Sequence, residues 1–404
     1  MGIFSLRLRT LVNSEIIIRI TFFLLTLGMQ VLVHTANFIF KIVIILTDCL
    51  LFMLCNSKLR IQKYHIARMG FIIYSGISFL WSTYLGNYML IPTYIYCIVT
   101  LILIHQFLNS EHRIHILMKC IILSSYILCI VLILHYGKSI YVSRIDNSIL
   151  NSNEAGITFA ISYTFCIYFF ILKNNLFYII TAMPLCLAVL LTGSKKGVII
   201  LLISSIVLII FKNNVGTNLF YRGIIVVIAL ALCLITVIRF VPNLYNIIGV
   251  RFIQFYEGIK NWNPSGVSRG SKSTALRMSL IRFGIEGILK KPILGYGLDN
   301  YRHFSPLELY SHADIIEILF NLGIIGGILY YWPFITLIRI FKNHRDYLDG
   351  ISKAFILGFI AYYLFLSLTC VTNNSLFNWI ILEIMISFMI IKYKQARHKI
   401  IQDI

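Results

Sequence analysis

Two neighbouring stretches decide the fold of this chain: Gly295-Tyr-Gly-Leu-Asp-Asn300, and Ser311-His-Ala-Asp-Ile-Ile-Glu-Ile-Leu-Phe-Asn-Leu-Gly-Ile-Ile-Gly-Gly327. A glycine-rich, charged loop leads here into an apolar helix. Asp314, Glu317 and Asn321 follow at helical spacings of three and four, so they share one face of that helix. Carboxylates at the mouth of a membrane helix are costly unless they line an aqueous cavity or find partners. The pattern predicts a polar site at this point.

The rest of the chain has the composition of a membrane protein. Apolar residues make up 59% of its 404 residues, charged residues make up 12%, and the mean hydropathy is +0.86. This composition excludes a water-soluble domain and predicts an all-α, polytopic transmembrane helix bundle. About twelve spans are expected, at about 16–33, 38–55, 66–82, 88–108, 114–135, 155–172, 176–192, 197–211, 221–241, 314–338, 354–371 and 374–392.

The distribution of lysine and arginine predicts how the chain is oriented. Alternate short connections between the spans and both chain ends are rich in these residues, whereas the intervening short loops carry none. By the positive-inside rule both termini are cytoplasmic. The first apolar run has no cleavage pattern and is expected to be a first span. Three regions follow: spans at 1–241, an external segment at 242–313, and spans with a cytoplasmic tail at 314–404.

The formal net charge of +20 does not indicate nucleic-acid binding, because most of it belongs to this cytoplasmic fringe. The nine cysteines lie in or beside apolar runs, without metal-ligand spacing, and are expected to be packing residues. Neither a metal site nor a cofactor is predicted. Glu383 and Asn378, in the last span, are expected to make polar contacts between helices.

Several cations break the orientation rule. Lys195 and Lys196 occupy a short turn on the outer side, and paired cations there suit a multiply charged anion such as a diphosphate. The external segment is also basic, although long loops cross a membrane regardless of charge. Within it, a helix is predicted from Ser273 to about Lys291.

This predicted helix is amphipathic. Its polar face holds Ala275, Ser279, Arg282, Glu286 and Lys290, with Arg282 and Glu286 spaced for an ion pair. Arg277 lies within its apolar stripe. That arginine either extends to the water from a helix lying on the bilayer, or contacts a lipid-linked phosphate. The sequence leaves both interpretations open.

Four motifs between about residues 150 and 330 resemble, in order, those of the bacterial O-antigen ligase and O-antigen polymerase superfamily. They are Asn151-Ser-Asn-Glu-Ala155, Thr192-Gly-Ser-Lys-Lys-Gly197, Arg277 with Lys291-Pro-Ile-Leu-Gly-Tyr-Gly297, and Ser311-His-Ala-Asp with Leu322-Gly-Ile-Ile-Gly326. Two positions depart from the family pattern. Lys195 replaces an arginine of the turn, and Ala313 replaces the asparagine that usually follows the histidine.

The resemblance implies a glycosyltransferase of the GT-C type in the bacterial plasma (inner) membrane. It would act, without a metal, on undecaprenyl-diphosphate-linked glycans at the outer leaflet. The hypothesis assigns the substrate diphosphate to Lys195, Lys196, Arg277 and Arg282. His312 is the expected general base, and Asp314 or Glu317 would orient it or replace it.

Three functions remain open at this stage. A surface-polysaccharide polymerase transfers the glycan to a lipid-linked repeat unit, an O-antigen ligase transfers it to lipid A-core, and a transporter or flippase moves a lipid-linked sugar without chemistry. The polymerase is favoured, with a chain-length regulator protein as a possible partner, because the Ile-, Asn- and Lys-rich composition is typical of variable polysaccharide loci. The transporter is disfavoured because no inverted repeat is evident.

The orientation can be tested by cysteine labelling in a background without the native cysteines. We expect an impermeant thiol reagent to label cysteine at Ser271, in the external segment, but not at Asn343, in a cytoplasmic loop. Labelling of whole cells, compared with labelling after lysis, makes the measurement. The reverse pattern would invert the topology and move the predicted site to the cytoplasmic side.

Overall fold

The computed structural model describes residues 14–32, 59–137, 151–211, 236, 239–260 and 272–402. These residues are helical or lie in turns, and no strand occurs among them. Six of the described helices are long and apolar enough to cross a membrane, which confirms the all-α membrane class. They are α5 (Leu90–Phe107), α6 (Glu111–Tyr136), α7 (Ser152–Lys173), α15 (Asp314–His344), α16 (Gly350–Thr369) and α17 (Leu376–Gln402).

Four other expected spans form shorter helices. They are α2 (Ser14–Leu27, continued by a π-helical turn to Leu32), α4 (Lys63–Ile77), α8 (Phe177–Leu191) and α9 (Lys195–Phe211). The spans expected at 38–55 and 221–241 lie outside the described residues. The number of crossings therefore remains a prediction beyond these six.

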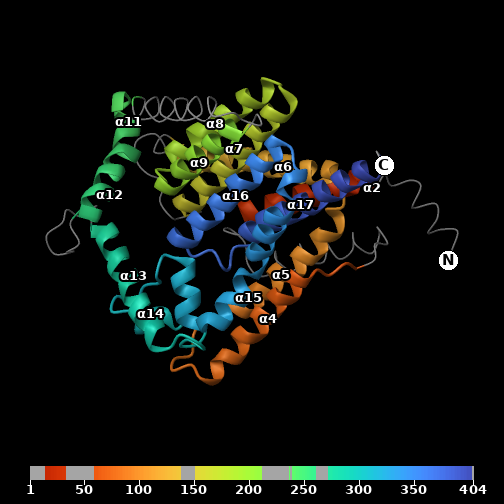
Figure 1. The fold of residues 1–404 in the computed structure, drawn as a ribbon. Helices are drawn as coiled ribbons and strands as arrows, with labels where there is room; N and C mark the ends of the chain where they lie inside the picture. Colours follow the sequence, from red (N-terminus) through yellow and green to blue (C-terminus); the bar gives the residue numbers. More distant parts are fainter. Residues whose placement is uncertain are drawn as a thin grey trace.

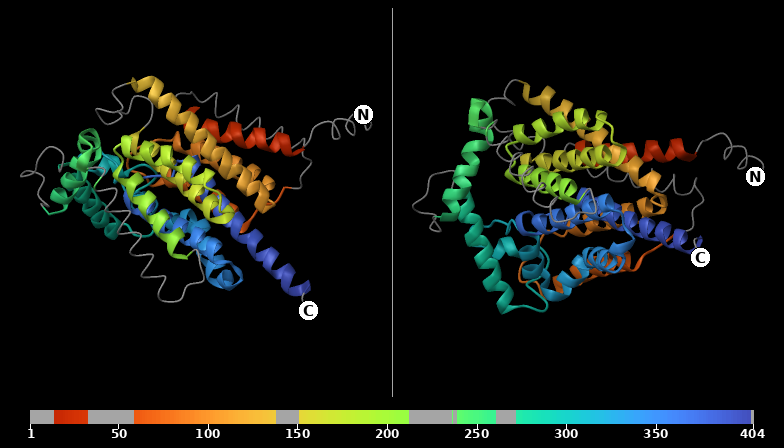
Figure 2. Two further views of the ribbon diagram at one scale, coloured as in Figure 1. Left: turned by 90° about the horizontal axis from the view of Figure 1, so that it is seen from above. Right: turned by 45° about the horizontal axis from the view of Figure 1, so that its top comes forward.

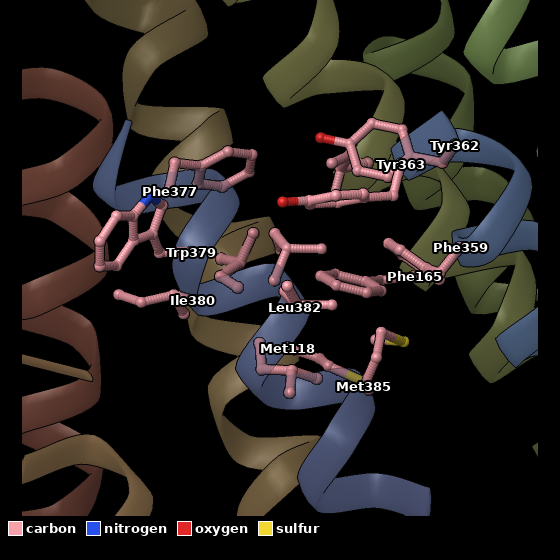
Figure 3. Packing of buried hydrophobic residues seen from close by; sticks show 14 of the residues in the cluster. Met118, Phe165, Phe359, Tyr362, Tyr363, Phe377, Trp379, Ile380, Leu382 and Met385 are labelled. Atoms are coloured by element: carbon pink, nitrogen blue, oxygen red, sulfur yellow. The ribbon is translucent and has the colours of Figure 1, made fainter. Parts of the chain in front are cut away.

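Helix α17 lies at the centre of the apolar core (Figure 3). Its residues Ile380 and Met385 are fully buried, as expected for a helix that is apolar on all sides. Aromatic rings of neighbouring helices fill the space beside it, and Phe165 of α7 stacks on Phe359 of α16 with 5.7 Å between ring centroids. This packing holds α7, α16 and α17 together.

An arm of helices crosses one end of the bundle. It comprises α11 (Pro242–Leu244), a π-helical turn (Tyr245–Gly249), α12 (Val250–Lys260) and α13 (Lys272–Lys290). Figures 1 and 2 show this arm, in green to teal, at the end opposite the C-terminal end of α17. Arg251 fastens α12 to the bundle by donating a hydrogen bond to the carbonyl of Gly193 (3.1 Å).

Helix α13 confirms the helix predicted between Ser273 and about Lys291. The predicted ion pair is present, with 3.1 Å between Nε of Arg282 and Oε1 of Glu286. One position of the predicted polar face was wrong, since Ala275 is buried. The buried side of α13 carries Leu280, Gly284 and Gly287, because Ile316 and Phe320 of α15 pack directly against the two glycines.

Helix α15 is broken at Gly323, whose dihedral angles (φ 61°, ψ −166°) are not helical. The segment 292–297 replaces the helical hydrogen bonds that the break removes. Ile324 donates its N–H to the carbonyl of Pro292 (2.8 Å), and Gly297 donates to the carbonyl of Asn321 (2.7 Å). Irregular backbone at membrane depth is tolerated only where such partners exist. The glycine-rich loop and the polar helix are therefore one structural unit.

Glycine is required on both sides of this junction. A Cβ on Gly323 would lie 2.1 Å from the carbonyl oxygen of Ile293, and one on Gly295 (φ 69°) would lie 2.5 Å from the backbone of Asn321. Both positions combine left-handed backbone with close backbone approach. The spacing of the glycines thus follows from the close backbone packing of the segment 292–297 on the break in α15.

We expect Gly323→Ala to lower the free energy of unfolding by more than about 2 kcal/mol, since it adds left-handed strain and a steric clash. Gly76→Ala, on α4, is the matched control, because nothing lies within 4 Å of a Cβ there. That change should alter stability by less than about 1 kcal/mol. Thermal unfolding in detergent measures both. Equal midpoints for the two variants would contradict the proposed role of the junction between the segment 292–297 and the break in α15.

Candidate functional site

The described residues enclose a cavity of about 890 Å³ between the arm and the bundle. Its walls come from the turn Gly28–Leu32, α5, α7, α9, α13, the segment 298–312, α15, the turn between α16 and α17, and the start of α17. A volume of this size lies at the upper end of the roughly 300–1,000 Å³ that is typical of ligand pockets. Four of the predicted site residues line it: Lys196, Arg277, His312 and Glu317.

Arg277 reaches the cavity from α13 and is half-buried. Its Nε is buried without a hydrogen-bond partner in the described part of the chain. No ion pair between Arg277 and a carboxylate forms among those residues either. A buried guanidinium N–H without a partner is costly, and an incoming anion would satisfy it.

Lys196 extends from the first turn of α9. Its Nζ donates to the carbonyl of Thr369, at the end of α16, and lies 2.9 Å from Sγ of Cys370. The helix start is fixed by Ser194, whose Oγ accepts a hydrogen bond from the N–H of Gly197 (3.1 Å). Lys196 and Arg277 are close enough to interact electrostatically. Together they bring two cations to one part of the cavity lining.

The close approach of α7 and α9 explains the motif around these lysines. A Cβ on Gly197 would lie 2.7 Å from the carbonyl oxygen of Gly156, and one on Gly156 would lie 2.4 Å from Cβ of Ser194. This contact brings the first turn of α7, with Asn153 and Glu154, to the cavity beside Lys196. The motifs at 151–155 and 192–197 thus meet in space.

His312 lies in the segment just before α15, with left-handed backbone (φ 61°). Its ring contacts the ring of Tyr310, with 4.1 Å between centroids. Burial first, and then the charges of Arg277 and Lys196, lower the pKa of His312 from 6.5 to about 4. Its imidazole is therefore neutral at physiological pH. Within the described ranges it makes no hydrogen bond, so a nitrogen lone pair can meet a substrate proton.

Asp314 does not line the cavity. Its carboxylate accepts hydrogen bonds from Tyr330 Oη (2.9 Å), from Thr372 N and Oγ1 (3.0 and 2.9 Å), and from Asn373 N (3.1 Å). No hydrogen bond joins it to His312 in the structure. With four donors, Asp314 anchors the turn between α16 and α17 to the start of α15, rather than orienting the imidazole.

Glu317 and Asn321 turn toward the cavity. Glu317 accepts a hydrogen bond from the N–H of Ser311 (2.8 Å), which fixes the backbone next to His312. Asn321 accepts one from the N–H of Tyr301 (2.7 Å). The predicted polar stripe of α15 therefore divides between an anchor, Asp314, and two cavity-lining groups.

Two predicted diphosphate ligands lie outside the cavity. Lys195 rests over the ring of Phe255 in α12, with its Nζ 4.7 Å from the ring centroid. Arg282 is 76% exposed and bonds to Glu286. The structure thus brings Lys196 together with Arg277, His312 and Glu317, and separates Lys195, Arg282 and Asp314 from them.

Sequence analysis missed several residues that line the cavity. Asp299 forms an ion pair with Arg302 (2.7 Å) and accepts a hydrogen bond from the N–H of Asn87. Its position in the glycine-rich loop Gly295–Asn300, next to the predicted polar site, could have indicated it. Tyr94 is fully buried on α5, within an ordinary apolar run, so nothing in its surroundings distinguished it.

A second polar cluster lies away from the cavity, around Glu383. This carboxylate contacts Nε2 of His65 (3.2 Å), Nδ1 of His105 (2.6 Å) and Oη of Tyr64 (2.8 Å). Two imidazoles and a carboxylate are metal-ligand types. However, Gln62 N–H donates to Nδ1 of His65, which leaves the proton on Nε2, facing Glu383. Hydrogen bonds therefore explain this cluster, and Glu383 joins α4 and α5 to α17 as predicted.

The lowered pKa of His312 predicts how stability depends on pH. Folded His312 binds a proton less readily than the unfolded chain, so acidification from pH 6.5 to about 4 destabilises the folded state through this group. Above pH 6.5 the group has no effect. We expect the wild type to lose more thermal stability than His312→Gln between pH 7 and 4.5. Parallel losses would show that His312 is not shielded from protonation.

Comparison with known proteins gives one family match, which includes several of the segments that line the cavity. Residues 177–331 match the family model described as O-antigen ligase. The match runs from the start of α8, through the lysine turn, the arm and the glycine-rich loop, to beyond the break in α15. A search of curated proteins found no match. With the six apolar helices, this match supports a multi-pass membrane protein that is similar, over residues 177–331, to the O-antigen ligase and polymerase superfamily.

Proposed function

We propose that the protein is a surface-polysaccharide polymerase. It transfers a glycan from undecaprenyl diphosphate to a lipid-linked repeat unit at the outer leaflet, and the arm and cavity lie on the outer face. The family supports glycosyltransferase-like chemistry. The observation that carries the proposal is Arg277, an arginine without an anionic partner among the described residues, beside Lys196 on a cavity of about 890 Å³.

These two cations suit the leaving group. As the bond between the sugar C1 and the diphosphate breaks, negative charge grows on the diphosphate oxygens. Preorganised donors at that place stabilise the transition state more than the ground state. Arg277 can offer a bidentate fork, whereas Lys196 offers a point charge held in place by the end of α16.

The acceptor hydroxyl must lose its proton as it attacks C1. His312 and Glu317 are the two candidate bases that line the cavity. Neutral His312 lies beside the cations, where it can also contact the diphosphate. A single displacement of this kind inverts the configuration at C1. Neither residue needs a metal ion for these steps.

A ligase that transfers to lipid A-core would use the same donor chemistry, and only the acceptor differs. The test is therefore made in two steps. Release of undecaprenyl diphosphate from a lipid-linked oligosaccharide by purified protein separates an enzyme from a transporter. Product length with lipid-linked repeats as the only acceptor then separates a polymerase from a ligase.

We expect Arg277→Ala to lower the rate of undecaprenyl diphosphate release at least tenfold, because a hydrogen bond to a charged group contributes roughly 1.5–3 kcal/mol. Arg277→Lys should recover part of the rate. Arg282→Ala, five residues farther along α13, is the matched control. Its side chain is exposed and paired with Glu286, so the rate should change less than twofold.

Equal losses in the Arg277 and Arg282 variants would contradict the assignment from geometry and return Arg282 to the site. Wild-type rates in both would favour the interpretation that Arg277 only extends to water.

A further inference from the structure

We propose that a second group of cavity-lining residues, Tyr94, Glu317 and Asn378, forms an acceptor subsite for an uncharged sugar. This inference rests on the proposed function, because it assigns the acceptor of the same transfer. It depends on different side chains from those that bind the diphosphate, so the two proposals can fail separately.

The reaction requires that the leaving diphosphate and the acceptor hydroxyl bind at two separate places in the site. In an inverting displacement the acceptor oxygen approaches C1 from the face opposite the leaving diphosphate. With the diphosphate at Lys196 and Arg277, the acceptor must lie on the other side of C1. The second group comes from α5, α15 and α17, whereas the cations come from α9 and α13. Tyr310, which also lines the cavity, interacts electrostatically with a residue of each group, Arg277 and Glu317.

Asn378 has the geometry of a prepared hydrogen-bond donor. Its Oδ1 accepts a hydrogen bond from Oη of Tyr362 (2.7 Å), and this contact fixes which way the amide faces. The nitrogen Nδ2 is then left with two hydrogens and, in the part of the chain that the structure describes, no acceptor. The side chain is 7% exposed and lines the cavity. A sugar hydroxyl or carbonyl oxygen there would accept from this amide.

Tyr94 provides an independent observation. Its ring is held between Phe71 and Trp379, with centroids 5.3 and 6.3 Å away, and the side chain is fully buried. Its hydroxyl nevertheless has no hydrogen-bond partner among the described residues, although it lies close enough to Asp314, Asp299 and Glu317 to interact with their charges. Buried tyrosine hydroxyls are rarely left without a partner. Because Tyr94 also lines the cavity, this unsatisfied hydroxyl lies next to the space that an acceptor would occupy.

Charge selects the class of sugar. Asp299 is neutralised by Arg302, whereas Glu317 forms no ion pair within the described ranges. None of its three side chains is a cation, so the group offers no ion-pair partner to a carboxylate-bearing sugar. Amides, a hydroxyl and a carboxylate are suited to the hydroxyl groups of a neutral hexose or N-acetylhexosamine.

The step is then balanced by the residues present. The acceptor O–H forms a bond from oxygen to C1, and its proton passes to the carboxylate of Glu317. The bond between C1 and the phosphate oxygen breaks, and its electron pair leaves with undecaprenyl diphosphate. The proton is released to water as the product departs.

Asn378→Asp tests the subsite in the purified full-length protein. The change is isosteric and keeps an oxygen for Tyr362, but it replaces the free NH₂ donor by an acceptor oxygen. We expect the KM for a lipid-linked N-acetylhexosamine acceptor to rise about tenfold or more, with the KM for the undecaprenyl-diphosphate-linked donor unchanged. Tyr362→Phe, which only removes the orienting bond, should raise the acceptor KM less. Asn343→Ala, at an exposed position on α15, is the control.

The outcomes separate the two proposals. If the wild type releases no undecaprenyl diphosphate from the donor, the proposed function itself is wrong. If it does, and Asn378→Asp leaves the acceptor KM unchanged or raises both KM values equally, the subsite is wrong. A wild type that prefers a uronic acid acceptor to the neutral one would likewise overturn the assignment of sugar class.

Discussion

The backbone junction between the break in α15 and the segment 292–297 is the contact on which the other features depend. Without the hydrogen bonds from Tyr296 and Gly297 to the last carbonyls before Gly323, a membrane helix would carry unsatisfied peptide groups. The same junction carries the next residues of the loop, Asp299 and Asn300, to the neighbouring loop at 82–87, where both make hydrogen bonds. The backbone hydrogen bonds at this junction thus position α15, the loop with Asp299 and Asn300, and the loop at 82–87 relative to one another.

Charge within the cavity is distributed unevenly, and the supporting contacts explain why this is tolerated. Lys196 is held by the carbonyl end of α16, where the helix dipole favours a cation. Asp314 is held by four donors and so is removed from the cavity. Arg277 and Glu317 are left without ion pairs in the described part of the chain. The charged groups that lack an ion-pair partner are the ones expected to face substrate.

Sequence patterns predicted much of this arrangement, and single residues show where prediction ends. Spacing placed the helix of Arg277 and the pair Arg282–Glu286 correctly, because these depend on local geometry. Spacing could not choose between Lys195 and Lys196, since adjacent residues differ by about 100° around a helix and only the fold shows which side meets the cavity. It also could not separate Asp314 from Glu317, because the turn at 370–375 that covers Asp314 is distant in sequence. Tyr94 lies in an ordinary apolar run, and only the structure shows that it lines the cavity.

The anchoring of Asp314 has a consequence for the order of synthesis. Three of its four hydrogen bonds come from Thr372 and Asn373, which the ribosome makes nearly sixty residues later. When α15 first emerges, this carboxylate has only Tyr330 of its own helix as a partner. Burial of such a group in lipid is costly until its partners arrive. The first half of α15, and with it the cavity wall, therefore reaches its final place only after α16 and the turn that follows it have been made.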